Sequence, residues 1–171
     1  MAITQQLVRI PATRLAACRQ SVAALDELCS FTSTPDEDRL DLNWWPGALT
    51  RAWALAGVDA RTLAVLRRGF DGDGEVNPAY REHPGTIWEH PVVALEASRV
   101  GEVAEALRAV PPTTVQAAVP SNAEEAEAAL GGIAREAVGD LAGQLARQHA
   151  ILRDFYGEAA RRGLAVVLWW D

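Results

Sequence analysis

The segment LAVVLWW at residues 164–170 decides the fold, because every position in it is apolar. Successive side chains of a strand point to opposite faces, so a strand with one solvated face alternates apolar and polar residues. An unbroken apolar run of this length is typical of a strand that helices cover on both faces. We therefore predict that residues 164–170 form the central strand of a sheet.

Working outward from this run, the spacing of apolar residues switches between the period of a strand and that of a helix. The spacing predicts strands at 3–10 and 92–95, and helices at 12–30, 48–56, 59–68, 96–110, 122–131 and about 138–162. The length of 171 residues suits one domain, 1–171. The predicted fold class is α/β (α+β), with a small mixed β-sheet of few strands layered by several helices.

The net charge of the chain indicates which partners it can bind. The net charge is −7, from 23 acidic and 16 basic residues, and every basic residue is arginine. An acidic surface repels polyanions, so nucleic acid is not expected as a partner.

Residues 1–10 lack the pattern of a secretory signal, and the run at 164–170 is too short to cross a bilayer. We expect a bacterial cytoplasmic protein without membrane contact.

The two cysteines fall on the helix predicted at 12–30, at positions that share its apolar face. On one helix, Cys18 and Cys29 would lie about 16 Å apart along the axis, which is beyond the reach of a disulfide. We expect both to be reduced, buried packing residues.

Residues 69–91 contain too many glycines and prolines for long regular structure and carry several acidic groups. The run from Asp71 to Asn77, with Glu82 at the twelfth position, imitates a calcium-binding loop. However, the sixth position requires a sharp turn and here is the β-branched Val76, and Pro78 also interrupts the loop. A solvated acidic loop is therefore the preferred interpretation.

Two histidines occur in a repeated tripeptide, Glu82-His83-Pro84 and Glu89-His90-Pro91. Imidazoles close to carboxylates can bind zinc or exchange protons, although this spacing matches no known metal motif. The alternative is that both are surface histidines. We expect the third, His149, to lie on the exposed side of the long helix.

Four of the six tryptophans form the pairs Trp44-Trp45 and Trp169-Trp170. Tryptophan commonly anchors a core or an interface, but adjacent strand residues face opposite sides, so one ring of each pair is free to line a groove. We predict that Trp44 or Trp45 lies within about 8 Å of residues 69–91, on one concave, acidic-rimmed surface. In the alternative, both pairs are buried wedges. The predicted ligand-binding residues are Trp44, Trp45, Asp71, Asp73, Glu82, His83 and His90.

Several segments resemble the YfbM-like bacterial domains of unknown function. Residues 152–168, LRDFYGEAARRGLAVVL, are similar to the C-terminal signature of that family, and residues 40–47, LDLNWWPG, are similar to its Leu-Asp-apolar and Trp-x-Gly pattern. Residues 95–107 resemble its middle helix. Where the family often carries polar residues, this chain has Pro46 and Leu49. The resemblance implies a layered α/β fold in the bacterial cytoplasm and supplies no catalytic residues.

The sequence contains no complete catalytic motif: Gly-x-Ser-x-Gly, the P-loop and Gly-x-Gly-x-x-Gly after a strand are all absent. We therefore predict no catalytic residue, no metal and no cofactor. The favoured hypothesis is a non-enzymatic binding or interaction module, such as a regulator or an immunity-type protein, with a protein partner or a second copy of the chain. The alternative is a small hydrolase or metal-assisted enzyme that uses the loop at 71–90.

Overall fold

The computed structural model describes residues 4–84, 90–137 and 139–171. Its helices are α1 (Ala12–Gln20), α2 (Val22–Cys29), α3 (Trp45–Leu55), α4 (Ala60–Asp71), α5 (Ala97–Ala109), α6 (Pro112–Ala118), α7 (Ala123–Leu130), α8 (Gly132–Glu136) and α9 (Leu141–Arg161). Its strands are β1 (Gln5–Ile10), β2 (Arg39–Asn43), β3 (Gly74–Glu75), β4 (Val93–Leu95) and β5 (Ala165–Trp170). Two short 3-10 helices, η1 (Asp36–Asp38) and η2 (Pro78–Glu82), complete the described elements.

The strands form one sheet in the order β2-β1-β5-β4-β3, which confirms β5 as the central strand. β5 pairs with β1 over six residues, from Gln5 opposite Trp170 to Ile10 opposite Ala165, and with β4 on its other side. Every described pairing is antiparallel, so the predicted mixed sheet is wrong in this respect. The connections between strands contain several helices. The spacing of apolar residues does not show whether such a connection returns the chain parallel or antiparallel to its neighbouring strand.

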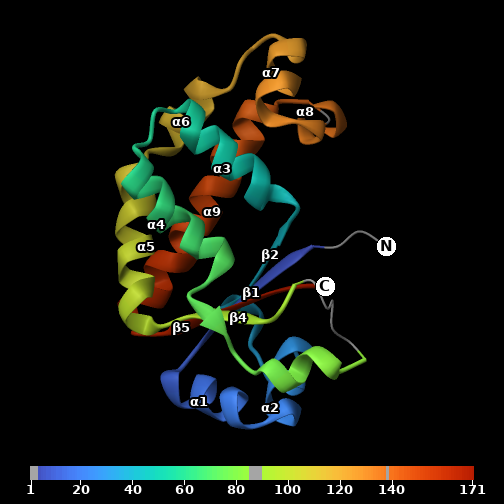
Figure 1. Cartoon of the computed structure of the whole chain (residues 1–171). Coiled ribbons are helices and arrows are strands. Elements are labelled where there is room, and N and C mark those ends of the chain that lie inside the picture. Colours follow the sequence, from blue (N-terminus) through green and yellow to red (C-terminus); the bar gives the residue numbers. More distant parts are fainter. Residues whose placement is uncertain (1–3, 85–89, 138) are drawn as a thin grey trace.

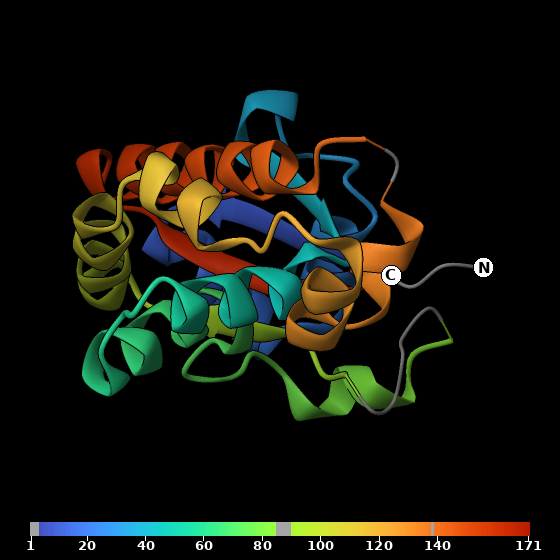
Figure 2. The same cartoon turned by 90° about the horizontal axis from the view of Figure 1, so that it is seen from above.

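Each face of the sheet carries its own hydrophobic core. Helices α3 to α9 lie on one side, and α1, α2 and η2 lie on the other, as Figures 1 and 2 show. Val166 and Leu168 belong to the first core, whereas Val167 and Trp169 belong to the second. This alternation explains why β5 is apolar at every position: both of its faces are buried.

The chain departs from the predicted elements at several places. The helix predicted at 12–30 is broken at Ser21, which has extended backbone angles and whose side chain accepts a hydrogen bond from the Ala24 amide. The edge strand β2 was not predicted, and α4 continues to Asp71 instead of ending near Arg68. Ile3, Glu89 and Val138, which also figured in the predictions, lie outside the described residues.

Because of the break at Ser21, Cys18 belongs to α1 and Cys29 to α2. The axial separation of about 16 Å, which assumed a single helix, therefore does not apply. Both are free thiols. Burial raises the pKa of Cys18, and it raises the pKa of Cys29 to about 12. Thiols with raised pKa values are weak nucleophiles at neutral pH, which agrees with the predicted packing role.

In the described part of the chain, no helix has both the length and the apolar character needed to cross a membrane.

The two cores give a direct test of the fold. Leu25 of α2 and Leu145 of α9 are fully buried, one in each core. We expect Leu25→Ala and Leu145→Ala each to lower the free energy of unfolding by about 2 to 5 kcal/mol, because each leaves a cavity. Leu55→Ala serves as the control, because this side chain is 43% exposed. Urea unfolding checks this; a loss below about 1 kcal/mol in either core variant contradicts the assigned core.

Candidate functional site

Two adjoining hollows lie where β1 begins and β5 ends. They have volumes of about 250 and 450 Å³ and share four lining residues, Gln5, Phe70, Asp71 and Trp170. His90 and Pro91 also line the smaller hollow, and the first turns of α3 line the larger one. We call the two hollows together the strand-end groove. In size and in its mixture of aromatic and polar groups, this groove resembles the small-molecule sites of other proteins.

The C-terminal end of α4 brings Phe70 and Asp71 to the strand-end groove. α4 ends there because Gly72 adopts a φ of 64°, which L side chains rarely adopt. A Cβ on Gly72 would also lie only 3.0 Å from the carbonyl oxygen of Ala94 and from the side chain of Val93. Glycine at position 72 therefore lets α4 end in contact with β4, which places Asp71 beside the sheet.

Two side chains satisfy the carbonyl groups at this end of α4. The hydroxyl of Tyr156 on α9 donates to the Gly69 oxygen at 2.8 Å, and Nε2 of Gln5 donates to the Phe70 oxygen at 2.7 Å. Burial raises the pKa of Tyr156, so its hydroxyl stays protonated as this donor role requires. The α4 terminus is thus fixed to both α9 and β1.

Gln5 combines almost complete burial with an unused acceptor. Its exposed fraction is 1%, and its Oε1 has no hydrogen-bond partner among the described residues. The bond from Nε2 to Phe70 determines which amide atom is the oxygen. An unsatisfied buried acceptor costs about 1 to 3 kcal/mol, and Gln5 lines both hollows, so a ligand donor that bonds to this oxygen would recover that cost.

Aromatic stacking holds Phe70 in the wall of the groove. The Trp53 ring lies parallel to the Phe70 ring, with their centroids 5.4 Å apart. The Trp53 indole Nε1 donates to Nδ1 of His149 at 3.1 Å, and Nε2 of His149 donates to the Val110 oxygen at 2.7 Å. These roles require the neutral tautomer protonated on Nε2.

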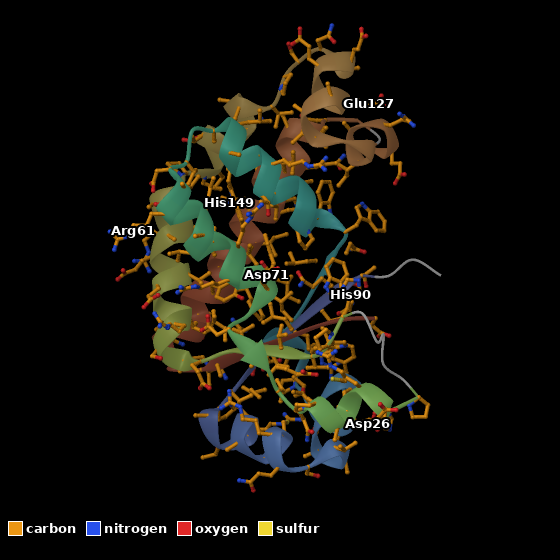
Figure 3. All side chains as sticks on the ribbon, viewed as in Figure 1. Asp26, Arg61, Asp71, His90, Glu127 and His149 are labelled. Atoms are coloured by element: carbon orange, nitrogen blue, oxygen red, sulfur yellow. The ribbon has the colours of Figure 1, made fainter. Side chains whose placement is uncertain are left out.

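The prediction that His149 is exposed is wrong, because its side chain is fully buried between the helices (Figure 3). Burial lowers the pKa of His149 more than its hydrogen bond to Val110 raises it. The sequence contained a signal: Leu145, His149, Leu152 and Tyr156 are spaced by four, three and four residues on one face of α9. The polarity of histidine favours the surface, whereas this spacing favours the core, and the folded chain follows the spacing.

Of the seven predicted site residues, Asp71 and His90 line the strand-end groove together. The His90 ring lies tilted against the Trp170 ring, with 5.5 Å between centroids. Gln5, Arg67, Phe70 and Trp170 are among the other lining residues, and none of them was in the predicted ligand-binding set. Of the Trp169-Trp170 pair, Trp170 lines both hollows, whereas Trp169 lines only the smaller one, is 5% exposed and packs on Phe31.

The other five predicted residues line neither hollow of the groove. Trp44 is half exposed just before α3, whereas Trp45 packs partly against the core. Asp73 pairs with Arg68 at 3.8 Å, and Glu82 is exposed at the end of η2. The proximity of Trp44 or Trp45 to residues 69–91 stays a prediction.

His83 belongs to a separate cluster with Asp26 of α2. Figure 3 shows Asp26 on the opposite side of the sheet from Asp71 and His149. Its Nδ1 lies 3.4 Å from the Asp26 carboxylate, which also accepts a hydrogen bond from the Tyr80 hydroxyl at 3.0 Å. The His83 and Tyr80 rings are stacked. Burial is the main cause of the raised pKa of Tyr80. This cluster joins η2 to α2.

The calcium-loop alternative fails on geometry. Asp71 is the last residue of a helix, and the Glu75 carboxylate accepts two hydrogen bonds from Arg81, at 2.6 and 3.0 Å. Within the ranges that the structure describes, no three His, Cys, Asp or Glu side chains are close enough to hold a metal ion. The described acidic residues of this segment therefore do not converge on one centre.

The fold and groove define a helix-rich α+β protein with a five-stranded antiparallel sheet and a ligand-sized groove at one end of it. The chain matches no family model and no curated protein. The crystal structure of YfbM from Escherichia coli, a protein of unknown function, matches it with a TM-score of 0.56 and 14% identity, covering 98% of this chain and 99% of that one. The fold is therefore YfbM-like.

The buried His149 predicts a loss of stability in acid. Its folded pKa is lowered, while its unfolded pKa is about 6.5, so the unfolded state binds the proton first as the pH falls. The stability is fully present above pH ~6.5 and is lost as the pH falls through the folded pKa. Urea unfolding between pH 8 and 5 measures this. We expect His149→Gln to be less stable at pH 8 and to show a flatter dependence on pH.

His83→Gln is the matched control for this experiment, because His83 is only half-buried. It should retain the acid-dependent loss of the wild-type protein. Equal pH dependence in His149→Gln and the wild type contradicts the assigned protonation state of His149.

Proposed function

We propose that this chain is a non-enzymatic binding module of the bacterial cytoplasm and that it holds its ligand in the strand-end groove. The observation that carries the proposal is the Gln5 amide, whose Oε1 is buried in the groove wall without a partner among the described residues. A groove that only completed the packing would have an apolar residue or a paired polar group at this position. A ligand N–H or O–H satisfies the acceptor.

The side chains in the wall of the groove are also preorganised, because other residues hold them in place. Gln5 is held by Phe70, Phe70 by the Trp53 ring, and Trp53 by His149. Side chains fixed in this way lose little conformational entropy on binding, which favours affinity. The rigid wall comes from strands and helices, which position a binding site more accurately than loops do.

The positions of the two histidines support binding over the hydrolase alternative. It required His83 and His90 to act together with acidic residues of the segment 71–90. His83 is instead engaged by Asp26 and Tyr80, and neither hollow of the groove is lined by both histidines. A general base must reach the proton that it removes, so two histidines in different environments support binding more than hydrolysis.

A larger side chain in the lining of the larger hollow tests whether the groove binds a ligand. A Cβ on Gly47, which lines the larger hollow, meets no atom within 4 Å, so Gly47→Leu extends the lining without a clash at its base. The isotopically labelled full chain is titrated with four mixtures: amino acids, dipeptides, nucleotides and sugar phosphates. We expect one mixture to shift the amide resonances of Phe70 and Asp71, and we expect Gly47→Leu to weaken that binding at least about tenfold.

Trp44→Ala is the control and also tests the interaction form of the hypothesis. Trp44 is exposed and lines neither hollow, so its removal should leave binding in the groove unchanged. If Gly47→Leu binds normally while Trp44→Ala does not, the binding surface is the face around Trp44, as expected for a protein partner or a second copy. If no mixture shifts the groove resonances, the proposed groove function is wrong.

A further inference from the structure

Resting on the proposed function, the arrangement of charges in the strand-end groove points to a ligand class. We propose that the groove binds a free α-amino acid with an apolar or aromatic side chain. The ligand's ammonium group faces Gln5 and Asp71, its carboxylate faces Arg67 and the start of α3, and its side chain lies against Phe70 and Trp170. All six of these groups line the larger hollow.

The first observation is a pair of opposite charges that do not pair with each other. Arg67 and Asp71 lie one turn apart on α4 and line the same hollow, yet neither side chain makes a hydrogen bond or ion pair with any described residue. Arginine before the acid is the weaker order for a pair at this spacing. Because they line one hollow and are not paired with each other, both charges are open to a ligand in the groove.

The second observation is the orphaned acceptor beside Asp71. Because Nε2 of Gln5 is committed to the Phe70 oxygen, Oε1 can only accept a hydrogen bond. A buried carbonyl oxygen and a nearby carboxylate together favour a group with several N–H donors and a positive charge. An ammonium group has both properties, whereas a purely anionic ligand would leave Gln5 unsatisfied and would be repelled by Asp71.

The third observation is that part of the lining of the larger hollow is positive, around Arg67 and the start of α3. Pro46 and Gly47 belong to the first turn of α3, and Trp44, its N-terminal neighbour, supplies no side-chain cap. Uncapped amides and the helix dipole attract an anion at this end. Arg67 adds a full positive charge, while Arg51 packs its guanidinium against Gly131. A carboxylate satisfies this positive part of the lining and an ammonium group satisfies Asp71, so a zwitterion complements both charges.

Aromatic rings complete the recognition of the ligand. Phe70 is fixed by its stacking on Trp53, and Trp170 is half-buried against His90. Hollows of about 250 and 450 Å³ are within or close to the range of small-molecule sites, and rings at their base favour an apolar side chain. L-phenylalanine is therefore the probe that matches all three features.

The experiment compares L-phenylalanine with two analogues, each of which lacks one charge. N-acetyl-L-phenylalanine keeps the carboxylate and loses the ammonium charge, and L-phenylalaninamide keeps the ammonium and loses the carboxylate. Calorimetric titration of the full chain should show that L-phenylalanine binds at least about tenfold more tightly than either analogue. Equal affinity for L-phenylalaninamide overturns the proposal in favour of a peptide N-terminus, and equal affinity for the acetylated form overturns it in favour of a simple anion.

Protein variants that each remove one charge from the groove complement the ligand analogues that each remove one charge from the ligand. Asp71→Asn should weaken L-phenylalanine at least about tenfold and leave N-acetyl-L-phenylalanine unchanged, whereas Arg67→Gln should weaken both and leave L-phenylalaninamide unchanged. Both side chains are exposed, so urea unfolding should show no loss of stability. Arg61→Gln, on the exposed first turn of the same helix, is the matched control and should change no affinity.

The failure of this inference is distinguishable from failure of the proposed function. If another mixture binds in a manner sensitive to Gly47→Leu but L-phenylalanine neither binds nor competes, the groove remains a binding site and the amino-acid assignment is wrong. If L-phenylalanine binds and Gly47→Leu and Asp71→Asn have no effect, the assignment to this groove is overturned. If nothing binds in the groove, both fall together.

Discussion

The pairing of β1 with β5 joins the two ends of the chain, and the remaining structure depends on it. Six residue pairs link these strands, and the backbone groups of Thr4 and Asp171 continue the ladder by one further pair. β5 sends alternate side chains into two cores, so each layer of helices is organised around the same strand. The last pair of the ladder, Gln5 and Trp170, also forms a wall of the groove. The constraint that closes the fold therefore also builds the candidate site.

A small number of buried polar contacts fix how the helices meet this sheet. Gln5 and Tyr156 hold the end of α4, and His149 holds Trp53 on α3. On the same face of the sheet, Arg9 of β1 is buried against Asp38, with 3.0 Å between its Nη2 and the carboxylate, and it lies over the Phe155 ring of α9. Each of these groups is costly to bury alone, and each makes at least one hydrogen bond or ion pair to an element distant in sequence, although Oε1 of Gln5 stays unsatisfied among the described residues. They select one arrangement of layers among those that apolar burial alone would permit.

The segment between α4 and β4 shows how a cluster in the sequence can separate in space. Asp71 and His90 meet at the groove, whereas Tyr80 and His83 cross to the opposite layer and pack against α2. Val76, between them, enters the core of that layer, and Glu75 is held by Arg81. The segment passes the edge of the sheet through β3, so its two halves face different sides. Proximity in sequence therefore predicted two members of the groove and wrongly grouped them with the rest.

The sequence by itself determined the features that come from local period and composition. The apolar run at 164–170 predicted a strand buried on both faces, and the spacing of Leu25 and Leu145 predicted their burial. Tertiary structure alone decided the partners of polar side chains. Gln5 became an orphaned acceptor and His149 a buried, neutral link between Trp53 and Val110. The physical reason is that the free energy of burying an apolar group depends mainly on the area removed from water, whereas that of a polar group depends on which atom lies within hydrogen-bond distance, and only the folded chain sets that distance.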